Sequence, residues 1–137
     1  MNYLLDTGFL YATLNRTEPR HSITLDIIRR IRGEIYLPVP AITETAYLLK
    51  RDLGGEAAAA FITSLATTSL ILESPGLTDY QRAAELMRQY ADADLDFVDA
   101  VIVAISERLE ITRILTLDLR DFRLIRPCHC EAFELFP

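Results

Sequence analysis

Apolar residues follow two alternating patterns along the chain. Short apolar runs of strand length lie between turn-forming residues, and longer segments repeat their apolar positions every three or four residues, as amphipathic helices do. Strands are predicted at 3–5, 35–37, 69–72, 113–117 and, at an edge, 132–136. Helices are predicted at 9–14, 21–31, 41–53, 56–66, 79–91 and 97–109. This alternation predicts a three-layer α/β fold, with a central, mainly parallel sheet of four or five strands flanked by helices.

The segment from Phe97 to Leu109 is the most apolar of the predicted helices and has little polar face. Such a helix belongs at the centre of a fold rather than on its surface. The chain has 137 residues, without an internal repeat or a linker-like stretch. We therefore expect a single domain over residues 1–137.

Composition narrows the classes of function. Half of the residues are apolar and the net charge is −6, which is typical of a globular protein and argues against nonspecific coating of nucleic acid. A nuclease remains compatible, because a metal-binding acidic site carries negative charge of its own. No leader or membrane-spanning segment is predicted, and Cys128 and Cys130 are too close in sequence for an ordinary disulfide. We expect a cytoplasmic protein.

Acidic residues stand at predicted strand ends and helix starts. Asp6 follows the first strand and Asp118 follows the fourth. Because the carboxyl ends of parallel strands share one edge of a sheet, both side chains are expected at that edge. Glu44 and Asp99 lie in the first turns of apolar helices, where an acid is costly unless it is paired, protonated or bound to metal.

Each acid also has a purely structural interpretation. Asp6 and Asp96 are suitable N-caps, and Glu44 and Asp99 suit the positive end of a helix dipole. Asp121 suits a turn or an ion pair with a neighbouring arginine. Together, however, converging carboxylates raise one another's pKa values, and a divalent cation is the usual compensation. All-oxygen ligands favour Mg²⁺ or Mn²⁺ over zinc.

Other chemistries have weaker support in the sequence. Asp92, Asp94 and Asp96 have the spacing that opens a calcium loop, but Phe97 and Val103 occupy its glycine and glutamate positions. Phosphate-binding and dinucleotide-binding glycine motifs are absent. The segment Cys128-His129-Cys130 lacks the second ligand cluster of a zinc site. The tyrosines and phenylalanines are predicted at core or surface positions rather than in a base-stacking array.

Four segments, in this order, resemble the motifs of PIN-domain proteins. They are Leu4-Leu5-Asp6-Thr7, Ile42-Thr43-Glu44, Leu95-Asp96-Phe97-Val98-Asp99-Ala100 and Ile114-Leu115-Thr116-Leu117-Asp118-Leu119-Arg120-Asp121-Phe122. Each segment alone is a weak signal, but their order and spacing over essentially the whole chain are similar to those of VapC-type toxins of bacterial toxin–antitoxin pairs. Gly8 departs from the Ser or Asn that often follows the Asp-Thr pair in this family.

The resemblance implies a Mg²⁺-dependent ribonuclease that hydrolyses RNA phosphodiester bonds with a metal-activated water, with Mn²⁺ as a possible substitute. The implied catalytic and metal-binding residues are Asp6, Glu44, Asp99 and Asp118. Secondary site candidates are Thr7, Asp96, Thr116 and Asp121, and the candidates for contact with substrate phosphates are Arg16 and Arg120. The family also implies a homodimer and a cognate antitoxin protein. The alternatives are an inactive PIN-like binding module and a metal-dependent hydrolase of DNA or another phosphate ester.

Overall fold

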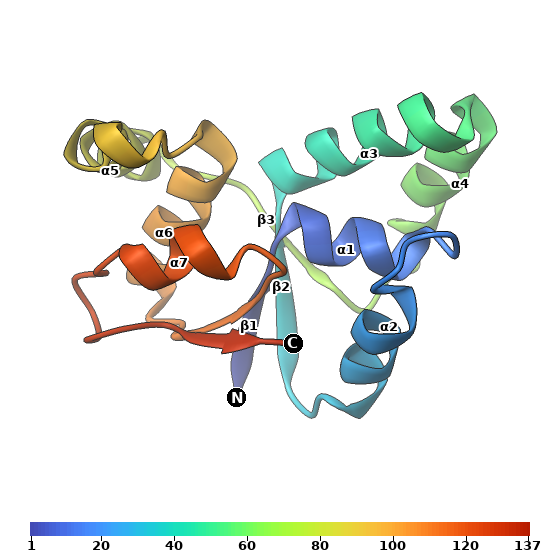
Figure 1. The fold of residues 1–137 in the computed structure, drawn as a ribbon, viewed down its shortest axis with the longest axis horizontal. Helices are drawn as coiled ribbons and strands as arrows, with labels where there is room; N and C mark the ends of the chain where they lie inside the picture. The colour runs from blue at the N-terminus through green and yellow to red at the C-terminus, as the bar shows by residue number, and fades with distance from the viewer.

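A computed structural model describes residues 1–137 (Figure 1). Its five strands are β1 (Asn2–Leu5), β2 (Glu34–Pro38), β3 (Ile71–Glu73), β4 (Arg113–Leu115) and β5 (Glu134–Phe136). Its seven α-helices are α1 (Thr7–Leu14), α2 (His21–Arg30), α3 (Val39–Leu53), α4 (Gly55–Ser64), α5 (Leu77–Gln89), α6 (Phe97–Leu109) and α7 (Leu119–Leu124). A 3₁₀ turn, η1 (Ala91–Ala93), precedes α6.

All strand pairs of the sheet are parallel, in the order β3-β2-β1-β4-β5. Strand β1 lies in the middle, where Tyr3 is in register with Ile35 of β2 and Arg113 of β4. From β1 the chain adds β2 and then β3 on one side of the sheet. It then crosses back and adds β4 and β5 on the other side of β1. Such a reversal opens a crevice at the carboxyl ends of the two strands, which is where sites form in sheets of this kind.

Helices cover both faces of the sheet, so the predicted three-layer α/β architecture is confirmed (Figure 1). Alternate residues of the strands point to opposite faces. Leu4 and Ile114 pack into the core beneath α5, α6 and α7. Tyr3, Leu5 and Leu115 pack into the core beneath α1 to α4. The two cores hold the central strands, and hence their carboxyl ends, rigidly between the layers.

The predicted central helix is confirmed as α6, where every residue from Asp99 to Ser106 is buried. Other predicted boundaries shift by a few residues. Strand β3 begins at Ile71 rather than at residue 69, because Leu70 N–H donates to Thr68 Oγ1 in a turn. Helix α7 was not predicted as a helix, because six residues are too few to show a helical period. None of the helices has the length and apolarity that crossing a membrane requires.

Candidate active site

Two Asp-X-X-Asp segments begin the helices α6 and α7. Asp96 Oδ1 accepts a hydrogen bond from Asp99 N–H at 2.9 Å, and Asp118 Oδ1 accepts one from Asp121 N–H at 3.2 Å. In each segment the first aspartate is the N-cap and the second lies in the first helical turn. The local sequence thus places two acids at the start of each of two helices.

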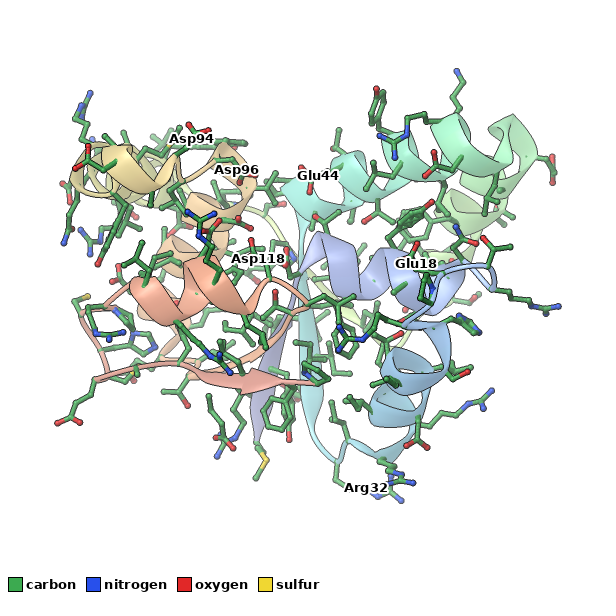
Figure 2. The ribbon with its side chains drawn as sticks, viewed as in Figure 1. Glu18, Arg32, Glu44, Asp94, Asp96 and Asp118 are labelled. Atoms are coloured by element: carbon green, nitrogen blue, oxygen red, sulfur yellow. The ribbon has the colours of Figure 1, made fainter.

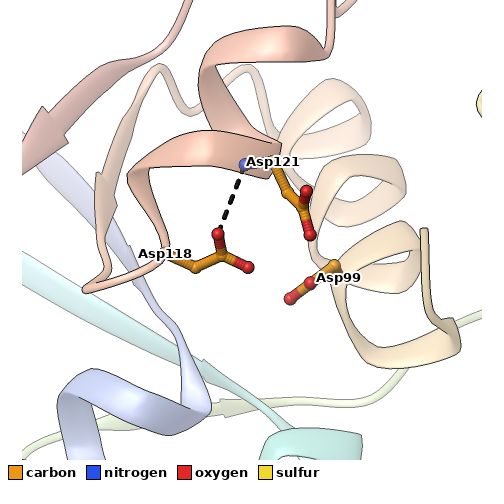
Figure 3. Close-up of side chains that lie close together, drawn as sticks. All are labelled: Asp99, Asp118 and Asp121. Carbon is orange, nitrogen blue, oxygen red and sulfur yellow. Dashed lines mark hydrogen bonds between the residues drawn. The ribbon is translucent and has the colours of Figure 1, made fainter. Parts of the chain in front are cut away.

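The two helix starts bring Asp99, Asp118 and Asp121 together (Figure 3). Each offers a carboxylate oxygen, and these three atoms lie within 4.8 Å of one another. Asp99 projects from α6, and the other two come from the start of α7 (Figure 3). Three carboxylates at this separation are within reach of a single cation.

Asp99 is the acid with the least compensation for a negative charge. Its side chain is buried, and its carboxylate accepts no hydrogen bond within the protein. Burial, followed by the charges of Asp6, Asp96, Asp118 and Asp121, raises the pKa of Asp99 to about 9. None of these main causes is a basic side chain, and Asp99 forms no salt bridge. The surroundings of Asp99 therefore favour either a proton or a bound cation.

Asp6 lies directly after β1 and caps α1. Its Oδ1 accepts from Thr7 N–H at 2.7 Å, and its Oδ2 accepts from the Thr116 hydroxyl at 2.8 Å. Burial raises the pKa of Asp6 to about 6, although these two hydrogen bonds oppose the rise. The charges of Asp118 and Glu44 add to it. Asp6 is therefore oriented by the protein and also close enough to the other acids to interact with them.

Thr116 joins the first strand to the acids of α7. Its hydroxyl donates to Asp6 and accepts from Asp118 N–H at 2.9 Å. The backbone of Thr116 is fixed in turn, because its N–H donates to Phe136 O of β5 at 2.9 Å. One fully buried hydroxyl thus sets the relative positions of two acids from distant parts of the chain.

Thr116→Val is expected to lower the free energy of unfolding by about 1–3 kcal/mol, because the substitution leaves the buried Asp6 Oδ2 and Asp118 N–H without this partner. Thr45→Val is the matched control. Thr45 is equally buried, but its hydroxyl has no hydrogen-bond partner, so its loss costs little or stabilises. Urea unfolding of both variants measures the difference. An equal effect of the two substitutions would contradict the positioning role of Thr116.

The remaining predicted residues lie around this cluster. Glu44 is half-buried on α3 and acts on Asp6 through its charge, but its carboxylate is not one of the three within 4.8 Å. In Figure 2, Glu44, Asp96 and Asp118 lie around one region, and Arg32 lies at the opposite end of the molecule. The buried Thr7 hydroxyl, next to Asp6, has no hydrogen-bond partner.

The two predicted arginines are less closely tied to the acids. Arg16 is exposed in the loop after α1, and Arg120 is exposed on α7. Burial and the neighbouring Asp118 raise the pKa of Asp121, and the charge of Arg120 opposes this rise. Arg120 therefore lies within electrostatic reach of Asp121.

Asp121 has a more central place than the sequence indicated. It was expected as a secondary candidate, whereas the structure groups it with Asp99 and Asp118. The repeat of the Asp-X-X-Asp spacing at residues 96–99 and 118–121 is the signal in the sequence that points to it. The resulting donor set consists of carboxylate oxygens alone, which fits Mg²⁺ or Mn²⁺.

Known proteins share both the sequence pattern and the fold. The family model described as PIN domain matches residues 3–126. Ribonuclease VapC26 of Mycobacterium tuberculosis is 28% identical over 134 residues, which cover 98% of this chain and 99% of that protein. Among solved structures, the sarcin–ricin loop cleaving toxin VapC20 of M. tuberculosis has a TM-score of 0.77 at 23% identity, over 82% of this chain and 86% of that chain. A toxin–antitoxin complex from Klebsiella pneumoniae has a TM-score of 0.65 at 18% identity, over 90% and 92%. The chain therefore belongs to the PIN-domain family and is similar, over nearly its whole length, to VapC proteins.

Proposed function

We propose that this protein is a divalent-metal-dependent ribonuclease and the toxin of a cytoplasmic toxin–antitoxin pair. The observation that carries the proposal is the buried Asp99 carboxylate, which faces Asp118 and Asp121 without a basic partner. Three carboxylate oxygens within 4.8 Å of one another repel when ionised, and a divalent cation relieves that repulsion. The ribonuclease named among its relatives supports RNA as the substrate.

Asp99, Asp118 and Asp121 would hold the metal, with Asp6 and Glu44 nearby as further ligands, directly or through water. When bound, Mg²⁺ supplies an activated water and polarises the phosphate that is attacked. Thr116 and Thr7 N–H keep Asp6 in one orientation, and Asp96 and Asp118 fix the starts of the helices. Arg120 and Arg16 are the candidates for contact with flanking phosphates.

The relatives also support a protein partner. The toxin–antitoxin complex among the similar structures supports a cognate antitoxin as the partner, and we propose that this antitoxin binds the chain and covers the acidic site. The protein used in activity measurements must therefore be free of any bound antitoxin. A homodimer, expected from the family resemblance, belongs to the same proposal.

Cleavage of tRNA, rRNA and single-stranded DNA, each with Mg²⁺ or with EDTA, tests the proposal. We expect RNA cleavage that requires the metal and that falls by about a hundredfold or more in Asp118→Asn, because asparagine caps a helix as well as aspartate but lacks the charge. Asp94→Asn is the control, since Asp94 lies exposed in the neighbouring loop and asparagine tolerates its left-handed backbone.

Each result of this panel has a defined meaning. Metal binding without cleavage of any RNA would favour an inactive binding module. Cleavage of DNA alone would identify a different phosphodiesterase. Cleavage that survives in Asp118→Asn would show that the acidic cluster is not the active site.

A further inference from the structure

Three exposed arginines follow one another along α7 and the segment just beyond it. Arg120 and Arg123 lie about one turn apart on α7, and Arg126 follows the C-cap of the helix. We call these three residues the arginine row. Helix α7 begins at the acidic cluster and runs from the carboxyl ends of the central strands toward one side of the molecule (Figure 1). The arginine row therefore leads away from the proposed reaction site.

No carboxylate of the protein pairs with the arginine row. Every ion pair in the structure belongs to one of five other arginines: Arg30, Arg51, Arg82, Arg108 and Arg113. The side chains of Arg120 and Arg123 also donate no hydrogen bond within the protein. The chain has 20 acidic side chains against 14 basic ones, so three neighbouring arginines without an acidic partner are available to an external anion.

Helix capping accounts for only one of the three side chains. Arg126 Nη1 donates to Arg123 O at 2.6 Å and to Ile125 O at 3.3 Å, which satisfies carbonyl groups at the end of α7. These bonds orient the guanidinium and leave its Nε and Nη2 without a partner. Arg120 lies in the first turn of α7, where a positive charge is unfavourable to the helix dipole. The stability of α7 therefore does not explain the row.

The position of the row beside the acidic cluster indicates which anion it binds. Three ionised carboxylates repel a phosphate chain, and one divalent ion offsets only part of their charge. The rest of a bound strand must therefore be attracted by groups outside the cluster. A guanidinium suits this task, because its planar N–H groups match the oxygens of a phosphate. Phosphate contacts position a strand and do not read its sequence.

We propose that the arginine row binds successive backbone phosphates of the RNA strand next to the phosphate that is cleaved. The inference rests on the proposed ribonuclease function and adds Arg123 and Arg126 to the surface that holds the substrate. Arg120 is the member nearest to the cluster, where its charge acts on Asp121. Arg123 and Arg126 extend the contact along the same strand, away from the reacting atoms.

Binding of a fluorescently labelled polyuridylate strand, with EDTA present, tests the row without any cleavage. Fluorescence anisotropy gives the affinity of wild type, Arg123→Gln and Arg126→Gln at several salt concentrations, with folding checked by circular dichroism. Each lost phosphate contact is expected to reduce the slope of log affinity against log salt by about 0.7 for a single strand. The affinity at low salt falls with it.

Arg32→Gln is the matched control for this measurement. Arg32 is exposed, forms no ion pair and donates to a backbone carbonyl, as Arg126 does. It lies at the opposite end of the molecule from Asp118 (Figure 2). Wild-type slopes in both glutamine variants of the row would overturn the proposal. So would an equal loss in Arg32→Gln, or absence of polyuridylate binding at low salt.

Arg123→Lys separates the charge of the row from other effects of substitution. Lysine keeps the positive charge but lacks the planar fork of arginine. We therefore expect a salt slope near that of the wild type, where Arg123→Gln reduces it. A slope reduced equally by lysine and by glutamine would show that charge is not the reason for the loss, and would overturn the proposal.

Two further probes identify the anion. Single-stranded oligodeoxythymidylate has the same phosphates as RNA, so the glutamine variants are expected to lose affinity for it to a similar extent. Polyglutamate carries carboxylates and represents an acidic protein segment. Weaker binding of polyglutamate in the glutamine variants, with unchanged binding of polyuridylate, would assign the row to a protein partner and overturn the proposal.

Cleavage kinetics connect the row to the reaction. On an RNA that the wild type cleaves, Arg123→Gln and Arg126→Gln are each expected to raise KM by about three- to fivefold, the size of an exposed ion pair, and to leave kcat near wild type. A fall in kcat with unchanged KM would overturn the proposal. Binding of RNA through the row, without cleavage of any RNA by the wild type, would refute the ribonuclease function and leave the binding surface in place.

Discussion

Asp99→Asn is expected to abolish RNA cleavage and, at the same time, to raise the melting temperature of the metal-free protein. The substitution removes a buried carboxylate that has no basic partner and that faces several other acids. Asparagine has nearly the same shape and carries no charge to desolvate. At neutral pH the metal-free folded protein must keep a proton on Asp99 that the unfolded chain releases, and asparagine avoids this cost of a few kcal/mol, which corresponds to a rise in Tm of about 5 °C or more.

Thermal unfolding in EDTA and cleavage in Mg²⁺, measured on the same preparations, check both halves of this result. Asp94→Asn makes the same change of side chain in the exposed loop before α6, and should leave both the Tm and the activity near wild type. A lower Tm in Asp99→Asn would show that the carboxylate has a structural role. Retained activity would remove Asp99 from the reaction.

The metal-free protein is expected to lose stability as the pH rises from about 5 to 9. Burial raises the pKa of Asp99 to about 9 and that of Asp6 to about 6, against 3.8 for both in the unfolded chain. The native state therefore holds protons that the unfolded state releases, and stability falls with pH until the native groups have also ionised. Asp52, whose pKa the Arg51 and Tyr11 hydrogen bonds lower to about 2, acts only at more acidic pH.

Mg²⁺ should reverse this dependence, because binding requires ionised carboxylates and displaces their protons. We expect 10 mM Mg²⁺ to raise the Tm more at pH 8 than at pH 6, by several degrees if the concentration exceeds the dissociation constant about a hundredfold. Differential scanning fluorimetry at the two pH values, with EDTA as the reference, measures the gain. Asp94→Asn should keep it and Asp99→Asn should lose it. An equal gain at both pH values would argue against binding at Asp99.

The placement of Asp6 and Asp118 at one edge could be predicted from the sequence because it depends on topology alone. Strands that alternate with helices must run parallel, and the acids that follow them meet at the carboxyl edge. The burial of Asp99 could also be predicted from the sequence. Asp99 lies in the first turn of a helix that is apolar on nearly all sides, so the helix has no polar face on which the acid could be exposed. These inferences need only the periodicity of the chain.

The remaining features depend on how helices from distant segments pack, which no local pattern encodes. Asp121 lies next to Asp99 because the starts of α6 and α7 converge. Helix α7 is too short for its apolar residues to show a helical repeat in the sequence. The surface groove between α3, α5 and the start of α6 could not be predicted for the same reason. Tyr47, Tyr80 and Phe97, which line it, lie on three different helices, and each alone resembles an ordinary surface residue.

The hydrogen bond between Thr116 and Asp6 joins residues that are 110 positions apart in the sequence. The acidic cluster can therefore form only late in synthesis of the chain. A ribosome makes Asp6 almost first, whereas Thr116, Asp118 and the β5 strand that fixes them are made at the end of this sequence. A nascent chain, or a fragment released before β4, therefore lacks an assembled acidic cluster. For the proposed ribonuclease, this order implies that RNA cleavage begins only after the chain has been made through β5.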